Sequence, residues 1–536
     1  MIHQLSGKPG GAKLKRRYSR PAQDKQASDA EVKRATTASA IGNATEWFDY
    51  GIYAVATSYI AHHFFEPFEY PMLLTLATFA ISFIIRPLGG FVWGPLGDRI
   101  GRKGVLAATI LMMSGATFLI GVLPTYAAIG AWAPVLLILL RVVQGFSTGG
   151  EYSGAATFMA EYAPNKRRGF FGSFLEFGTI SGYAIGSAMM LTLETILTAE
   201  QMTAWGWRLP FLLALPLGLI GFYLRNKLED TPIFQESQEE EVAKPAAKTA
   251  KKKQSKAEKA ASGTPGLGEL LKDYWRPILV MGGMVTALNI VNYTLLTYMP
   301  TYLEQQVGLD AQSALTVILI GELAMMALMP LAGSLSDRIG RKTCWNVSLI
   351  GIGVLAVPLF SLIGLNLGWA IIGYAVLAML FVLQLGTISA TFTALFPTRA
   401  RFAGFAISYN VATALFGGTA ALVSDFFVEV TGSLLVPAFY MMIACVVGLI
   451  AVYFMPETAG ASLQGDELPG TLGTPVVAGT PAYIALENGK QPDQRGLNDQ
   501  EMLEVVEAVN GDSLSAAASS NGRVQSDRTQ QSTSKR

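Results

Sequence analysis

Long apolar stretches, repeated along most of the chain, constrain this fold more than any other feature. The hydrocarbon core of a bilayer is about 30 Å thick, so a spanning helix needs roughly 20 apolar residues. The sequence contains twelve stretches of about that length with few charges. They lie near residues 36–60, 72–95, 104–123, 133–157, 169–193, 209–225, 277–299, 313–335, 344–363, 369–392, 402–427 and 434–455. The sequence therefore predicts an all-α membrane protein that crosses the bilayer twelve times.

The composition fits a chain of this class. Only 15% of the 536 residues are charged and 51% are hydrophobic, whereas soluble domains carry about 25% charged residues. We find no nucleotide-binding loop, metal-ligand cluster or nucleophile–base motif in the sequence, so we expect no enzyme, no metal site and no bound cofactor. The net charge of +1 gives no indication of a nucleic-acid partner. The expected partners are the lipid bilayer and a small-molecule substrate, and the oligomeric state is left open.

Lysine and arginine residues predict the orientation. They cluster before the first span and after the second, fourth, sixth, eighth and tenth spans, whereas loops such as "EPFEYP" and "PTYAAIGAW" contain none. Positive residues stay on the cytoplasmic side of a membrane, so we expect both termini to be cytoplasmic. The clusters after the spans are Arg99, Arg102 and Lys103; Lys166, Arg167 and Arg168; Lys248 to Lys259; Arg338, Arg341 and Lys342; and Arg399 and Arg401.

The same pattern divides the chain into five parts. The two ends and the middle are polar and lack apolar periodicity, as disordered segments do. The tail offers one short helical stretch near 498–509 and no sustained heptads, so it does not predict a coiled coil. The expected parts are a basic arm at 1–34, a six-helix half at 35–225, a cytoplasmic linker at 226–276, a second six-helix half at 277–456 and a tail at 457–536.

An internal repeat explains the two halves. "GPLGDRIGRKGVL" (Gly94–Leu106) returns as "GSLSDRIGRKTCW" (Gly333–Trp345), each time between the second and third span of its half. Self-similarity of this kind marks a duplicated architecture. Parallel six-helix halves place a substrate site between them, near the middle of the bilayer.

The repeated loop resembles the signature of the major facilitator superfamily. "RVVQGFSTGGEYSGAATFMAEYAPNKRRGFFGSFLEFG" (Arg141–Gly178) and "GNATEWFDYGIY" (Gly42–Tyr53) resemble its metabolite:proton symporter branch. Within that branch, "WGWRLPFLLALPLGLIGFYLRNKLEDTPIFQ" and "NYTLLTYMPTYL" are most similar to the proline/glycine betaine transporters. The resemblance covers about residues 35–462. It implies a major facilitator fold, a bacterial inner membrane location and proton symport of a zwitterionic compatible solute by alternating access.

Two other functions stay open at this point. A proton symporter of a small organic acid, such as 2-oxoglutarate, citrate or shikimate, would need two cations, which Arg86 and Arg141 could supply. A membrane sensor that transports nothing is the second alternative.

The resemblance also implies a gating role for the repeated loops, in which ion pairs form in one conformation and break in the other. The simpler interpretation is that their positive charges only fix the topology. Either way the two aspartates are expected to be gating residues rather than substrate ligands. The gating candidates are Asp98, Arg99, Arg102, Asp337, Arg338 and Arg341.

Two carboxylates lie deep in the first span. Glu46 follows Arg34 by 12 residues, roughly 18 Å at 1.5 Å per residue. A carboxylate facing lipid at that depth costs at least about 2.5–3.5 kcal/mol, so such groups face a cavity or a partner. We expect Glu46 and Asp49 to exchange the coupling proton; a permanent ion pair between helices is the alternative. They share one helical face with Asn43, Tyr50 and Tyr53.

Buried arginines are the candidate partners of these acids. Arg141 lies near the middle of the fourth span, and Gln144 follows it by one turn. Related facilitators keep an arginine at this position and link it to proton coupling, which the resemblance implies here too. Arg86 in the second span is the second candidate. Glu176 is a further acid expected in the proton or substrate pathway, whereas Glu322, in the middle of a span of the second half, receives no role.

Aromatic and amide side chains suggest where a zwitterion could bind. Quaternary ammonium groups are recognised by aromatic rings, and a carboxylate needs a cation. The cavity candidates are Asn43, Trp47, Tyr50 and Tyr53 in the first span and Asn289, Asn292 and Tyr293 in the seventh.

Overall fold

The computed structural model describes residues 29–100, 102–149, 151–227, 267–461 and 463. All of them belong to one compact unit, and no β-strand occurs within these ranges. Most of the predicted arm, linker and tail, including the helical stretch predicted near 498–509, lies outside the described residues.

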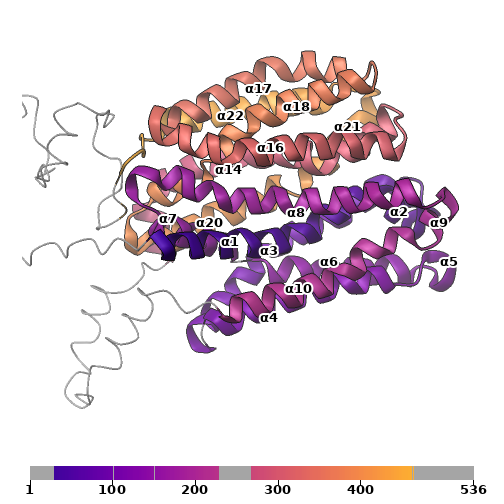
Figure 1. Ribbon diagram of the computed structural model, residues 1–536, viewed down its shortest axis with the longest axis horizontal. Helices are drawn as coiled ribbons and strands as arrows, with labels where there is room; N and C mark the ends of the chain where they lie inside the picture. Colours follow the sequence, from indigo (N-terminus) through magenta and orange to yellow (C-terminus); the bar gives the residue numbers. More distant parts are fainter. Residues whose placement is uncertain (1–28, 101, 150, 228–266, 462, 464–536) are drawn as a thin grey trace, which may run out of the picture. The chain divides into compact units, whose positions relative to one another are not determined.

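The first half runs from α1 to α10 (Figure 1). Its spans expose large apolar side chains, such as Ile84, Leu88 and Leu139, and short turns join them. The elements are α1 (Asp29–Val55), α2 (Thr57–Ile60), η1 (Ala61–Phe65), α3 (Pro71–Ile100), α4 (Arg102–Val122), α5 (Tyr126–Ile129), α6 (Trp132–Ser147), α7 (Glu151–Tyr162), η2 (Asn165–Arg167), α8 (Arg168–Ile196), α9 (Ala199–Ala204), η3 (Gly206–Arg208) and α10 (Leu209–Lys227).

The second half repeats this organisation after the linker. Its elements are α13 (Leu267–Asp273), α14 (Trp275–Tyr293), η4 (Thr294–Tyr298), α15 (Met299–Thr301), η5 (Tyr302–Gln306), α16 (Ala311–Ile339), α17 (Arg341–Ile363), α18 (Leu367–Leu385), α19 (Ile388–Phe392), η6 (Thr393–Leu395), α20 (Thr398–Phe416), α21 (Thr419–Thr431) and α22 (Val436–Phe454).

Within the described ranges, nine helical segments are long and apolar enough to cross a membrane. Three further long helices, α1, α4 and α8, bring the two halves to six spans each. Helix α1 carries the predicted acids Glu46 and Asp49, which explains its lower hydropathy.

Three segments next to the predicted domain boundaries have side chains buried against the bundle. Helix α1 begins at Asp29 and buries Val32, inside the expected arm. Helix α13 lies within the expected linker and buries Leu270. Residues 457–461 and 463, expected in the tail, pack against the bundle, where Thr458 and Leu463 are buried.

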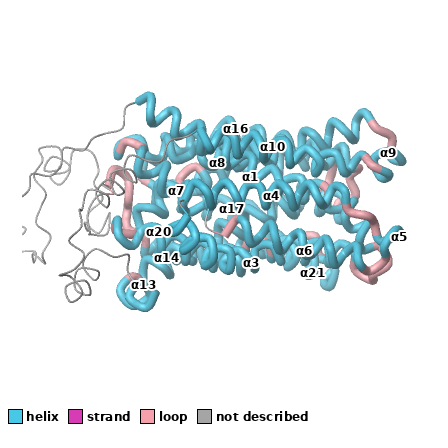
Figure 2. The backbone as a smooth tube through the Cα atoms, turned by 90° about the horizontal axis from the view of Figure 1, so that it is seen from below, coloured by secondary structure: helices cyan, strands magenta, loops and turns pink. Residues whose placement is uncertain are grey.

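Within the described residues, the two halves meet along several seams, one of which joins α7 to α19 and α20. Helix α8 of the first half packs against α16 of the second, and both views place them side by side (Figures 1 and 2). Helix α3 packs against α20 and α21, and α1 packs against the π-helical turn η4. Any pathway between the halves must therefore run between these seams.

Breaks in the spans concentrate at the seams. The span of α20 and α21 is interrupted at Gly417 and Gly418, and a Cβ on Gly418 would lie 2.5 Å from the ring of Phe83 on α3. Irregular backbone is tolerated at membrane depth where protein covers it. The break lets α21 approach α3 more closely than a regular helix with side chains would.

Candidate functional site

The predicted face of α1 is buried, but it contacts several helices. Asn43 donates to the carbonyl of Leu175 (2.8 Å) and to the hydroxyl of Thr179 (2.5 Å), both on α8. Tyr53 donates to the carbonyl of Thr75 on α3 (3.0 Å). Asn43 and Tyr53 therefore hold α1 against its neighbours within the first half.

Arg141 lies at the centre of a polar network in the first half. Its guanidinium donates to Gln144 Oε1 (2.8 Å) and Ser82 Oγ (3.1 Å), and lies 4.1 Å from the ring centre of Tyr53. Gln144 Nε2 donates in turn to Thr117 Oγ1 (2.6 Å). Asp49 lies beside Thr117 and within electrostatic reach of Arg141. The structure thus brings together the predicted residues Asp49, Arg141 and Gln144.

Arg86 is held differently, among aromatic rings. Its guanidinium carbon lies 4.6 Å from the ring centre of Phe83, 4.9 Å from that of Tyr50 and 5.7 Å from that of Trp47. Among the described residues, its Nε and Nη2 have no hydrogen-bond partner. The charges of Glu46 and Arg86 act on each other. Arg86 is therefore a buried cation with unused donors beside the acid Glu46.

A cavity lies between the halves, beside these groups. Its described walls leave room for about one water molecule at most. Tyr152 donates to Glu176, and the Tyr152 ring stacks on Tyr409 with the ring centres 4.5 Å apart. The first half contributes Trp47, Glu176 and Thr179 to the lining, and the second half contributes Leu288, Asn289, Asn292, Tyr293, Leu385, Ile388 and Tyr409.

Several predicted residues do not line this cavity. Glu46 and Asp49 line a separate small cavity inside the first half, together with Met113 and Ser114 of α4 and Gly221 of α10. Tyr50 is fully buried and its hydroxyl lies 3.3 Å from that of Thr148. The cavity of Glu46 and Asp49 is therefore separate from the cavity between the halves, and Arg86 interacts with a residue of each, Glu46 and Trp47.

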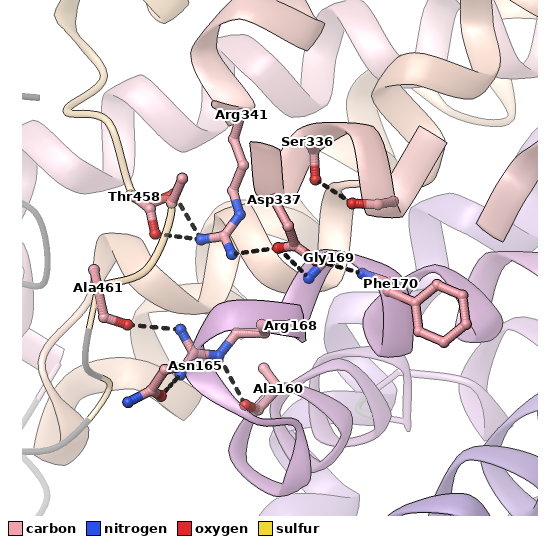
Figure 3. Close-up of polar contacts among 12 residues, drawn as sticks. Ala160, Asn165, Arg168, Gly169, Phe170, Ser336, Asp337, Arg341, Thr458 and Ala461 are labelled. Atoms are coloured by element: carbon pink, nitrogen blue, oxygen red, sulfur yellow. Dashed lines mark hydrogen bonds and ion pairs between the residues drawn. The ribbon is translucent and has the colours of Figure 1, made fainter. Parts of the chain in front are cut away.

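One end of the bundle, which we call the basic end, carries Arg168, Arg341 and Arg401. Figure 3 shows Arg168 and Arg341 at this end. There Asp337, near the end of α16, accepts hydrogen bonds from the backbone N–H groups of Gly169 (2.8 Å) and Phe170 (2.9 Å). These N–H groups begin α8, where the helix dipole favours a negative charge. Asp337 of one half thus caps a helix of the other.

The backbones are unusually close at this contact. A Cβ on Gly169 would lie 2.4 Å from the carbonyl oxygen of Gly333, and one on Gly333 would lie 2.4 Å from the carbonyl oxygen of Gly169. Side chains at these positions would push α8 and α16 apart. Glycine is therefore required here for the halves to close.

The segment after α22 completes the basic end. Glu457 accepts from the backbone N–H groups of Arg341 and Lys342 (both 3.0 Å), at the start of α17. Arg341 also donates to Thr458 Oγ1 (3.1 Å) and lies 3.6 Å from Asp337 (Figure 3). Arg341, a gating candidate, therefore connects this segment to the contact between the halves.

Two further arginines join the same segment to both halves. Arg168 of the first half donates to the carbonyl of Ala461 (2.7 Å), and Arg401 of the second half donates to that of Leu463. Arg401 also pairs with Glu161 of the first half (2.8 Å). The segment and this ion pair therefore link the halves at the basic end.

Sequence reasoning assigned Arg168 and Arg401 only to topology, and Glu161 to nothing. A signal was present: each arginine follows a proline, Pro164 or Pro397, by four residues. In the structure Arg168 Nε and Arg401 Nε each donate to the carbonyl of the residue eight positions earlier (3.0 and 3.1 Å). The two halves therefore share this Pro–Arg motif as well as the repeated loop, and it makes the same contact in each half.

The remaining gating candidates are Asp98, Arg99, Arg102 and Arg338. The backbone of Asp98 and Arg99 ends α3 and that of Arg102 begins α4, but their side chains lie outside what the structure describes. Arg338 is exposed.

Contacts also join the halves at the opposite end. Ser58 of α2 donates to Glu304 of η5 (2.5 Å), and Gln312 of α16 donates to Thr195 of α8 (3.4 Å). The cavity thus lies between two sets of contacts.

In the described ranges, no group of three His, Cys, Asp or Glu side chains could hold a metal ion.

Comparisons with known proteins agree with this arrangement. The family described as "Sugar (and other) transporter" matches residues 35–467. A glycine betaine/proline/ectoine/pipecolic acid transporter, OusA, of Dickeya dadantii is 41% identical over 442 residues, 82% of this chain and 86% of that protein. The proline/betaine transporter of Escherichia coli K12 is 40% identical over 441 residues, with the same coverage. The ectoine/proline transporter ProP of Corynebacterium glutamicum is 41% identical over 443 residues, 81% of this chain and 86% of that one.

A solved structure has a similar fold. The proton:xylose symporter XylE of the major facilitator superfamily superposes with a TM-score of 0.64 at 19% identity, covering 81% of this chain and 98% of that one.

Proposed function

Because this chain belongs to the sugar (and other) transporter family of the major facilitator superfamily, we propose that it takes up a zwitterionic compatible solute, such as proline or glycine betaine, in symport with protons. The proton is the coupling ion and no cofactor takes part. The relatives' names, which include proline, betaine and ectoine, support this substrate class.

The cavity between the halves carries the proposal. A solute with a positive nitrogen needs aromatic faces or an acid, and Trp47, Tyr293 and Tyr409 line the cavity together with Glu176. Glycine betaine has no N–H to donate, so the rings would hold its trimethylammonium group. Proline would in addition donate its ammonium hydrogens to Glu176.

Arg86 is the partner we assign to the solute carboxylate. It lies against Trp47, a cavity residue, and its Nε and Nη2 have no partner within the described residues. Two adjacent guanidinium nitrogens suit the two oxygens of a carboxylate. Arg141 is less suitable, because two of its nitrogens already donate to Gln144 and Ser82.

Proton coupling would follow from the electrostatic interaction between Glu46 and Arg86. A charged Glu46 competes with the solute carboxylate for the same guanidinium. Protonation of Glu46 removes that competition, so that proton and solute bind together and leave together. Asp49 is a second acid of this kind: it lies within electrostatic reach of Arg141, and Thr117 and Gln144 connect the two.

Transport requires the two ends to open in turn. The cavity is too small for the solute while both ends are closed, so the halves must separate to admit it. Asp337, Arg168 and Arg401 hold the basic end closed, and Ser58 with Glu304 holds the opposite end.

The orientation we propose follows from the positive charges. The basic end faces the cytoplasm, which places both termini inside the cell. The bacterial relatives support a location in the inner membrane.

Competition for uptake tests the substrate class. Proteoliposomes would be given labelled glycine betaine with excess unlabelled proline, betaine, citrate, 2-oxoglutarate or shikimate. We expect the zwitterions to inhibit the uptake of labelled glycine betaine. We expect this uptake to be reduced strongly in Arg86→Gln and less in Arg86→Lys. Inhibition by the acids alone would favour an organic-acid symporter, and no uptake of any solute would favour a sensor.

A further inference from the structure

One buried acid plays no part in the site described above. Glu322 lies in the middle of α16, and its side chain is fully buried. Within the part of the chain that the structure describes, neither carboxyl oxygen has a hydrogen-bond partner. Among the described lysine, arginine and histidine side chains, none forms an ion pair with Glu322.

Glu322 is located at the seam between the halves. Ser187 of α8, in the other half, faces it, yet the Ser187 hydroxyl is also without a hydrogen bond to any described group. Tyr183, one turn earlier on α8, lies within the electrostatic influence of Glu322 and of Arg86. The carboxyl therefore faces the Ser187 hydroxyl across the seam without a hydrogen bond of ordinary length and angle.

The other neighbours of Glu322 carry no charge that could balance it. Tyr374 of α18 packs against Gly321, whose added Cβ would lie 2.2 Å from the ring, and it interacts electrostatically with Glu322. The Tyr374 hydroxyl donates to the carbonyl of Leu295 (3.2 Å). Tyr183 and Tyr374 are thus the titratable groups that face Glu322, one from each half.

A charged carboxylate in these surroundings would be strongly destabilising. An ion at membrane depth without a partner is costly, and an unpaired buried charge destabilises a protein by several kcal/mol. The carboxyl is therefore neutral while α8 and α16 are closed against it. If the halves separate along this seam, water reaches the carboxyl, and the proton can leave its oxygen for that water.

We propose that Glu322 is a second proton-carrying site: it takes a proton from water while the seam between α8 and α16 is open on one side of the membrane, holds it while the seam is closed, and returns it to water when the seam opens on the other side. The site is distinct from Glu46 and Asp49, which lie inside the first half. The inference rests on the proton-coupled transport proposed above, and it adds a proton whose release depends directly on the movement of one half against the other.

Two measurements on the reconstituted full chain test this site. The first is the proton-to-solute ratio, compared between wild type, Glu322→Gln and Glu322→Asp. Glutamine has nearly the shape of the protonated acid, so the closed state should form and exchange of solute across the membrane should persist. We expect the ratio to fall by a full proton in Glu322→Gln and to be retained in Glu322→Asp. Glu429→Gln, which removes an exposed acid of α21, should leave the ratio unchanged.

The second measurement does not depend on transport. Infrared spectra of the reconstituted protein should show the carbonyl stretch of a protonated carboxylic acid that is lost in Glu322→Gln, shifted in Glu322→Asp and kept in Glu429→Gln. An unchanged ratio in Glu322→Gln, or an infrared band that does not change, would overturn the inference. If the wild type itself transports no protons, the proposed function fails, and the infrared band still decides whether Glu322 is protonated.

Discussion

Asp337 accepts a hydrogen bond from the backbone N–H of Gly169 across the interface of the two halves, at 2.8 Å. The acid ends one helix and the glycine begins another, so the contact can form only when the halves are closed at the basic end. Closure is thereby linked to a single carboxylate of the repeated loop.

Removing this carboxylate should open the basic end. Hydrogen bonds to a charged group contribute about 1.5–3 kcal/mol each, so Asp337→Ala should lower the closed-to-open ratio at least about tenfold. Electron–electron distances between spin labels on Arg167→Cys and Arg338→Cys would report the opening. Asp310→Ala is the matched control, because Asp310 caps α16 within its own half, accepting from Ser313 N–H at 2.9 Å. Equal distance distributions in Asp337→Ala and the parent would contradict this role.

A methyl group at Gly333 should also prevent closure. The added Cβ would lie 2.4 Å from the carbonyl oxygen of Gly169, and overpacking of this kind costs about 1–3 kcal/mol. We expect Gly333→Ala to insert normally but to lose most concentrative uptake. Gly282→Ala on α14 serves as the control, since an added Cβ there has no neighbour within 4 Å among the described atoms. Full uptake by Gly333→Ala would show that the close approach is not needed.

Shortening the chain should separate the role of the segment after α22 from that of the tail. A chain ending after residue 471 keeps the acceptors for Arg168, Arg341 and Arg401, whereas one ending after residue 456 loses them. We expect the longer chain to transport normally. In the shorter chain we expect the basic end to be open in a larger fraction of the molecules. Accessibility of a cysteine at Asn289, which lines the cavity, to an impermeant reagent added on that side would measure this. The same labelling rate in both chains would exclude the segment from the gate.

The ring of Tyr409 should contribute to solute affinity. A cation over an aromatic face gains about 0.5–2 kcal/mol, so Tyr409→Leu should raise the KM for glycine betaine about 2- to 30-fold. Tyr409→Phe keeps the ring that stacks on Tyr152 and should stay near wild type. The KM values come from initial rates of uptake. An equal loss in both variants would point to the hydroxyl instead of the ring.

Much of the architecture could be predicted from the sequence, because span length and the repeated loop are local signals. The repeat and the branch-specific stretches identified the major facilitator fold, which the family match and the XylE superposition confirm. The helical period of α1 also correctly placed Glu46 and Asp49 on a buried face.

The neighbours of that face could not be predicted. Periodicity tells which residues share a side of a helix but not which helix covers it, so the cavity of Glu46 and Asp49 against α4 was not foreseen. Tyr409 was missed for the same reason, because one aromatic residue in an apolar span carries no local signal. Arg168 and Arg401 were missed because the topology rule already accounted for them.

The most direct test of the central claim is accumulation driven by a proton gradient. Proteoliposomes of the wild-type chain, alkaline inside, would be given labelled glycine betaine with and without a protonophore. The account predicts an internal concentration that rises above the external one, falls back when the protonophore is added, and reaches a clearly lower level in Glu46→Gln. Internal and external concentrations that stay equal in the wild type, despite the gradient, would contradict it.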